Sequence, residues 1–184
     1  MGKHNRHGKA HPLTERNYEQ IRQELISDSH KLFFDIAYFT GERWGAICRL
    51  KVENVFDCGL PRRYVTFEKS TRKDRVTRQV PVSSRLDILL RSATIPDDVW
   101  LFPSKFPSKS SDGHLSFHAA DDFLRRAVEA ADLSHLGIST HSSRRGLITR
   151  LHNLGVSVRE IQSITGHANL SNLSRYIDVS DSRR

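Results

Sequence analysis

The chain has few cysteines among its 184 residues. Cys48 and Cys58 are the only two, and their spacing of ten residues fits neither a zinc-binding pair nor a dense disulfide framework. We therefore expect both to be ordinary core or surface thiols.

Long apolar runs are also absent from the sequence. No stretch of about 18 apolar residues occurs, and the N-terminus is basic and polar, without the apolar segment of a secretory signal. These absences argue against a membrane or secreted protein, and we expect a cytoplasmic one. A chain of this length is enough for one domain with its own core and too short for two.

Acidic residues are outnumbered by basic ones. The 29 Lys and Arg residues against 21 Asp and Glu give a formal net charge of +8, which favours a polyanionic partner, nucleic acid before membrane. Residues 1–12 include three His and three Lys or Arg with almost nothing apolar, so burial cannot offset the entropy lost on ordering. We interpret them as a basic flexible arm, or as the remainder of a longer chain, and expect the folded domain to span 13–184.

From Leu13 onward the apolar residues recur mainly with the period of a helix, and Thr14 is a suitable N-cap for the first one. Helices are expected over 15–27, 31–39, a short stretch after Gly41, 83–91, 117–131, 141–153, 158–165 and about 170–177. Between Val52 and Val82 the period shortens toward two, which predicts a small antiparallel sheet whose last turn is rich in cations. The expected fold class is mainly α with a small antiparallel β-sheet.

His141 and Arg144 stand three residues apart at the start of a predicted helix, which places them on the same face. An imidazole can transfer a proton near neutral pH, and a guanidinium matches two oxygens of a phosphate. The alternative is an exposed basic helix start without chemistry.

Thr165, Gly166 and His167 form the end of a predicted helix, and Tyr176 follows nine residues after the histidine. Gly166 lets the backbone turn, so that His167 can point away from the helix axis and Tyr176 can approach it. Taken alone, His167 is equally well explained as a helix cap and Tyr176 as a core or surface aromatic.

Two further cations stand at marked positions. Lys73 and Lys69 belong to a basic turn between two predicted strands, and a hairpin tip can reach into a DNA groove, although most such runs are simply solvated charge. Arg43 follows directly after a buried helix, where a surface ion pair is the alternative.

The order of these candidates resembles the tyrosine recombinase, or phage integrase, family. Segment 40–50, TGERWGAICRL, resembles the family's first box, and 140–146 with 154–176 resembles its second. Segment 73–82 is similar to the hairpin that carries the family's catalytic lysine, and a count of eight residues back from Pro81 selects Lys73, with Lys69 as the second choice. The resemblance implies the tyrosine recombinase catalytic-domain fold.

The resemblance also implies an activity, namely site-specific cleavage and rejoining of double-stranded DNA through a 3′-phosphotyrosine, with self-association as a tetramer on DNA and a cytoplasmic, nucleoid-associated location. The implied roles are the nucleophile Tyr176, the phosphate-binding Arg43 and Arg144, the general acid Lys73, the proton-transfer residue His141 and the hydrogen-bond donor His167. No metal or cofactor is expected, because two guanidiniums supply the electrostatic stabilisation.

Two departures from the family pattern bear on this hypothesis. Ala46 stands where many members have an acidic residue three positions after the arginine, so support for Arg43 is expected from elsewhere. Only the short basic arm precedes the catalytic domain, so we expect the N-terminal core-binding domain to be absent and the chain to be a fragment or a short member resembling the small fimbrial-switch invertases.

Three other functions are compatible with parts of the sequence. Segment 158–177 fits a helix-turn-helix with Gly166 at the turn, as in a non-enzymatic DNA-binding protein. A metal-free ribonuclease would use His141, His167 and Lys73 without Tyr176. A type IB topoisomerase would use the same chemistry as a recombinase, without sequence preference.

Overall fold

The computed structural model describes residues 10–72, 74–106 and 112–166. Within these ranges the chain is mainly helical, which confirms the expected fold class. The helices are α1 (Glu15–Glu24), α2 (Asp28–Thr40), α3 (Trp44–Ile47), α4 (Ser84–Arg91), α5 (Phe117–Ala130), α6 (Ser142–Asn153) and α7 (Val158–Thr165). The strands are β1 (Phe56–Asp57), β2 (Leu60–Pro61), β3 (Tyr64–Phe67) and β4 (Arg78–Pro81). None of the helices in the described ranges is long and apolar enough to cross a membrane.

Local capping explains where the first two helices begin. Thr14 Oγ1 accepts a hydrogen bond from the backbone N–H of Asn17, as its sequence position predicts for an N-cap. α1 ends at Glu24, earlier than expected, because Leu25 is extended and buried while the Ser27 hydroxyl caps α2. The buried central helix therefore begins at Asp28, three residues before the expected start at residue 31.

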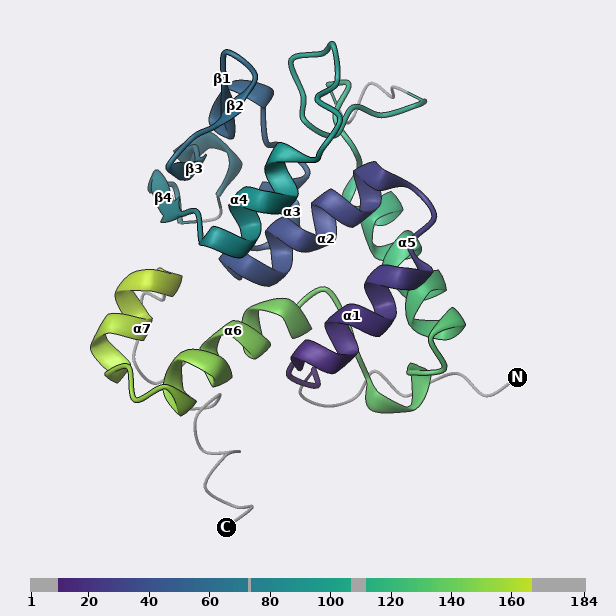
Figure 1. The fold of residues 1–184 in the computed structure, drawn as a ribbon, viewed down its shortest axis with the longest axis vertical. Helices are drawn as coiled ribbons and strands as arrows, with labels where there is room; N and C mark the ends of the chain where they lie inside the picture. Colours follow the sequence, from purple (N-terminus) through teal and green to yellow (C-terminus); the bar gives the residue numbers. More distant parts are fainter. Residues whose placement is uncertain (1–9, 73, 107–111, 167–184) are drawn as a thin grey trace.

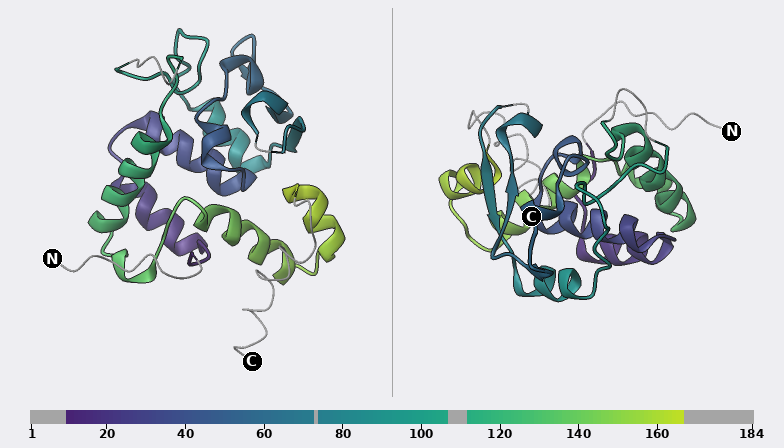
Figure 2. Two further views of the ribbon diagram at one scale, coloured as in Figure 1. Left: turned by 180° about the vertical axis from the view of Figure 1, so that it is seen from behind. Right: turned by 90° about the horizontal axis from the view of Figure 1, so that it is seen from above.

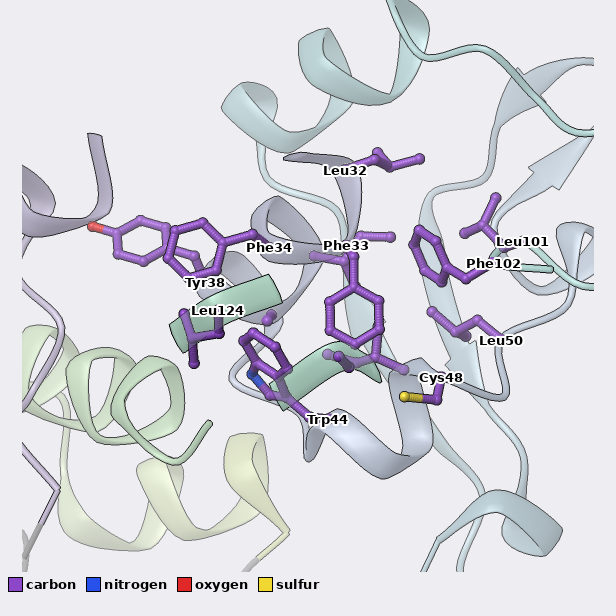
Figure 3. Close-up of a cluster of buried hydrophobic side chains, with 14 of the residues drawn as sticks. Leu32, Phe33, Phe34, Tyr38, Trp44, Cys48, Leu50, Leu101, Phe102 and Leu124 are labelled. Atoms are coloured by element: carbon purple, nitrogen blue, oxygen red, sulfur yellow. The ribbon is translucent and has the colours of Figure 1, made fainter. Parts of the chain in front are cut away.

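Helix α2 lies at the centre of the fold and contacts α1, α3, α4 and α6 (Figure 1). Phe33 is fully buried and its ring lies 4.9 Å from the rings of both Trp44 and Phe102, centroid to centroid (Figure 3). Burying aromatic rings of this size is the main source of stability in such a core. Cys48 is buried in the same cluster, whereas Cys58 is exposed, and both thiols are free.

The expected single sheet is instead two separate two-stranded antiparallel sheets, β1 with β2 and β3 with β4. The strands of the first sheet are only two residues long, because Cys58 and Gly59 reverse the chain with positive φ angles. Val52, expected in a strand, begins a 3-10 turn. Figures 1 and 2 agree that the β3–β4 hairpin and α7 lie on the same side of the molecule.

Candidate active site

Three of the six predicted site residues lie in the described ranges, and the structure brings all three together. Arg43, His141 and Arg144 line one pocket of about 350 Å³. Lys73, His167 and Tyr176 lie outside the described residues. Two further arginines line the same pocket, Arg49 and Arg72.

The turn between α2 and α3 carries Arg43 to the pocket. Gly41 ends α2 in the left-handed conformation, with φ of 58°, and a Cβ placed on it would lie 2.6 Å from the Leu147 side chain of α6. This close approach seats the turn against α6. Arg43 then stands at the N-cap of α3 with its side chain 40% exposed, and its Nη1 lies 3.8 Å from Asp74 Oδ2.

The Nη1 atom of Arg43 is buried and has no hydrogen-bond partner among the described residues. Asp74 Oδ2, 3.8 Å away, compensates part of its charge, and the Arg43 side chain as a whole is 40% exposed and lines the pocket. An anionic oxygen is the acceptor that a guanidinium binds most strongly.

The start of α6 supplies the other two residues. His141 is exposed at the N-cap position, and Arg144 is buried in the first turn. Arg144 Nη1 donates to the carbonyl of Gly41 over 3.1 Å, and its Nη2 donates to the carbonyl of Thr165 over 2.6 Å. These bonds fix the guanidinium between the α2–α3 turn and the end of α7.

A buried carboxylate, that of Glu42, belongs to a residue that lines the same pocket. Glu42 has a fully buried side chain, and its Oε2 accepts hydrogen bonds from Arg72 Nη1 over 2.9 Å and from Arg78 Nη1 over 2.8 Å. Arg144 Nη1 lies 4.0 Å from the other carboxylate oxygen. Burial of a lone carboxylate is strongly unfavourable, and the surrounding guanidiniums offset that cost.

Arg72 is also paired with Asp74, which stands two residues along the chain. Its Nε and Nη2 donate to the two carboxylate oxygens over 3.0 Å and 2.6 Å, in a bidentate arrangement. These hydrogen bonds lower the pKa of Asp74 to about 2. Asp74 is therefore a carboxylate at neutral pH and places a negative charge beside Arg43.

The C-terminal end of α7 is tied to the same cluster. The Arg78 guanidinium donates to the carbonyls of Ile164 and Thr165, and the latter also accepts from Arg144. Cations are favoured at a helix C-terminus, where backbone carbonyls lack partners within the helix. Gly166 follows with φ of 66°, and a Cβ there would lie 3.0 Å from Arg72 Nη2, so the described chain ends against the cluster.

The interpretation of the sequence missed three members of this cluster, Glu42, Arg72 and Arg78. One of them left a signal, because Arg78 and Val80 alternate with exposed residues along β4, and an arginine on the inward face of a strand needs a buried acid. Nothing comparable marks Glu42, which directly precedes Arg43. Its burial depends on contacts with residues 30 and 36 positions away.

Chemically, a pocket lined by four arginines and one histidine suits a phosphodiester. Guanidiniums bind its non-bridging oxygens, and an imidazole can transfer protons near neutral pH. Within the described residues no cluster of three or more His, Cys, Asp or Glu side chains is arranged to hold a metal ion.

Comparison with known proteins finds relatives over most of the chain. The "Tyrosine recombinase XerC" of Halalkalibacterium halodurans is 28% identical over 187 residues, which cover 93% of this chain and 58% of that protein. A "Tyrosine recombinase" of Pseudothermotoga lettingae is 28% identical over 175 residues, covering 88% and 55%. The chain thus spans little more than half the length of these curated relatives.

Solved structures show the same fold. The crystal structure of XerA recombinase superposes with a TM-score of 0.71 at 19% identity, over 92% of this chain and 60% of that one. A lambda integrase dimer bound to a COC' core site gives a TM-score of 0.68 at 23% identity, over 92% and 48%. The sequence model described as "Phage integrase family" matches residues 11–183, and the chain therefore belongs to the phage integrase family.

Proposed function

We propose that residues 13–184 are the catalytic domain of a site-specific tyrosine recombinase, which cleaves and rejoins double-stranded DNA. One observation carries the proposal. Arg43 and Arg144, far apart in the sequence, line one pocket with His141, and the Arg43 side chain is 40% exposed. A phosphate of DNA is the ligand that this arrangement suits.

In the proposed reaction the Tyr176 hydroxyl attacks the scissile phosphorus. A bond forms between the tyrosine oxygen and phosphorus, the bond to the 5′-oxygen breaks, and a 3′-phosphotyrosyl link retains the phosphodiester energy for rejoining. Arg43 and Arg144 bind the non-bridging oxygens, whose negative charge grows in the transition state. A phenol has an ordinary pKa of about 10, so a cationic pocket favours its deprotonation.

Lys73 is proposed to protonate the leaving 5′-oxygen, His141 to assist proton transfer, and His167 to donate a hydrogen bond to a non-bridging oxygen. The neighbours of these residues in the chain support this. Arg72 lines the pocket, Asp74 lies beside Arg43, and Gly166, which precedes His167, lies against Arg72.

The partners follow from the same chemistry. We propose that the chain acts on double-stranded DNA as a tetramer, because strand exchange joins four DNA ends, and that it acts in the cytoplasm at the nucleoid. The net charge of +8 favours binding to DNA. We assign no cofactor and no metal to the reaction, and residues 1–12 to a basic arm.

The test is covalent trapping on a nicked suicide substrate made from the flanks of the protein's own gene. The unmodified chain should give a protein–DNA adduct on a denaturing gel, and Tyr176→Phe should bind DNA but give none. Tyr64→Phe is the matched control, because Tyr64 is 48% exposed on β3 and does not line the pocket. An adduct that persists with Tyr176→Phe contradicts the assignment of the nucleophile. Binding without any adduct favours the helix-turn-helix alternative, and relaxation of supercoils without sequence preference favours a topoisomerase.

A further inference from the structure

We propose that Glu42 is a positioning residue for the cleavage reaction. Its carboxylate holds Arg144 and the β3–β4 hairpin in fixed positions around the DNA phosphate. The expected effect on cleavage rests on the proposed recombinase function. Glu42 lies one residue before Arg43, in the turn between α2 and α3. Ala46, where an acidic residue was expected from the family pattern, is buried and carries no charge. The carboxylate close to Arg43 in this turn is therefore that of Glu42.

Glu42 joins three parts of the chain that are distant in sequence. Its Oε1 accepts the backbone N–H of Arg43 over 2.8 Å, which fixes the carboxylate to the turn. Its Oε2 accepts from Arg72, just before Lys73, and from Arg78 at the start of β4. The two ends of the segment that contains Lys73 are thereby attached to the turn that contains Arg43.

The connection to Arg144 runs through the end of α7. Arg78 bonds both Glu42 and the carbonyl of Thr165, and Arg144 bonds that same carbonyl and the carbonyl of Gly41. Arg144 is also 4.0 Å from Glu42 Oε1. These contacts form a closed network. Among the described residues, Glu42 is the only acidic side chain that forms ion pairs with both Arg72 and Arg78.

The charges explain why the network needs this acid. Arg72, Arg78 and Arg144 have side chains no more than 9% exposed, so water screens their mutual repulsion poorly. Burial lowers the pKa of Arg78, and the nearby Glu42 charge opposes that change. Without the carboxylate, we expect the guanidiniums to move apart and the geometry around the phosphate to be lost.

Glu42 acts through the arginines and not on DNA. Glu42 is among the residues that line the pocket, but its side chain is 0% exposed and its carboxylate oxygens already accept from the Arg43 N–H, Arg72 and Arg78, so it offers a phosphate no contact. A carboxylate facing the phosphate would repel it, whereas this one is neutralised by its own partners. The role is therefore positioning, and removal of the charge should lower the rate of cleavage more than the affinity for DNA.

The test uses Glu42→Gln in the full chain, with Glu53→Gln as control because the Glu53 side chain is 69% exposed and pairs only with Lys51 in the described residues. Single-turnover adduct formation at saturating DNA should slow on the order of 100-fold for Glu42→Gln, the usual effect of a misplaced catalytic group. The Kd for DNA should change less than about fivefold. A loss confined to Kd, with the cleavage rate intact, would overturn the proposal.

A double-mutant cycle separates positioning from general destabilisation. If Glu42 acts through Arg144, adding Glu42→Gln to Arg144→Lys should cost much less than it does in the unmodified chain. Fully additive losses would contradict the proposal. Glu42→Asp keeps the charge on a side chain that is one methylene shorter, and it should lose less cleavage activity than Glu42→Gln. If Glu42→Gln does not fold, Glu42→Asp takes its place in these measurements.

A readout that needs no DNA keeps this proposal separate from the proposed function. In proton–nitrogen NMR spectra the guanidinium N–H groups of Arg72, Arg78 and Arg144 should exchange slowly with water. Glu42→Gln should accelerate that exchange, and Glu53→Gln should leave it unchanged. Unchanged exchange in Glu42→Gln would refute the network even if the protein cleaves DNA. Accelerated exchange without any adduct from the unmodified chain would instead count against the recombinase function.

Discussion

The indole Nε1 of Trp44 donates a hydrogen bond to Ser143 Oγ over 3.3 Å, across 99 positions of sequence. Trp44 follows Arg43, and Ser143 precedes Arg144, so this bond ties together the two short segments that present the two arginines proposed to bind the phosphate. Both side chains are buried. The two boxes of the sequence are thus joined directly, beside the pocket that they line.

This bond should be measurable as a coupling between the two side chains. Trp44→Phe and Ser143→Ala should each lower the free energy of unfolding by about 1–2 kcal/mol, since each removes one buried hydrogen bond and some packing. The double variant should lose less than the sum of the two, by about 1 kcal/mol. Urea denaturation of the four proteins checks this, and strict additivity would show that the bond does not contribute.

A second prediction concerns the glycine at which α6 meets the segment before α1. A Cβ on Gly146 would lie well inside van der Waals contact with the carbonyl oxygen of Leu13, whereas a Cβ on Gly45 in α3 meets nothing within 4 Å. Replacing glycine by alanine inside a helix is ordinarily stabilising by up to about 1 kcal/mol. Gly45→Ala should therefore be neutral or stabilising.

Gly146→Ala should be destabilising by about 2 kcal/mol or more, because backbone must move to admit the methyl group. The midpoint of thermal unfolding should fall for Gly146→Ala and not for Gly45→Ala. If the two variants unfolded at the same temperature, α6 and Leu13 would be packed less closely than they are in the structure.

The proposed chemistry makes a third prediction, for Arg43. Lysine keeps the charge but cannot offer the planar donors that match phosphate oxygens, so Arg43→Lys should slow single-turnover cleavage by roughly 100-fold or more. Binding of DNA should weaken far less. Arg16→Lys, at an exposed position of α1, is the matched control and should cleave at the normal rate. Normal cleavage by Arg43→Lys would remove this residue from the reaction.

The helices were predictable from the sequence because their signals are local. Thr14 caps α1 as expected, and α5 follows the apolar face that ends near Ala131. The strands β1 and β2 were not, because each is only two residues long. A strand of two residues is too short to show an alternating pattern of apolar and polar residues in the sequence.

The site divides in the same way. Arg43, His141 and Arg144 were found through short spacings that resemble a family, and the structure places them around one pocket. Glu42 and Arg78 are 36 residues apart, and no local pattern predicts that a carboxylate and a strand arginine meet. Lys73, His167 and Tyr176 stay predictions, because they lie outside the described residues.

The last prediction concerns pH and follows from the pair formed by Asp74 and Arg72. Asp74 has an ordinary pKa of 3.8 that the Arg72 hydrogen bonds lower to about 2 in the folded protein. A depressed carboxyl pKa stabilises the fold at pH values above the unfolded pKa, and this contribution is lost as the pH falls through the folded pKa. The stabilisation should therefore be complete above about pH 5 and should disappear between about pH 4 and pH 2.

Asp74→Asn isolates this contribution. At pH 6 the variant should unfold with a free energy lower by roughly 1–2 kcal/mol, since the carboxylate is only 28% exposed and its bidentate bonds are partly shielded from water. The difference from the unmodified chain should narrow as the pH falls below about 4, because the unmodified Asp74 is then protonated as well. Asp122→Asn on α5 removes a more exposed carboxylate that pairs with Arg126 and should show little change at any pH. If the difference in unfolding free energy between Asp74→Asn and the unmodified chain stayed constant from pH 6 to pH 2, the charge of Asp74 would not account for the effect.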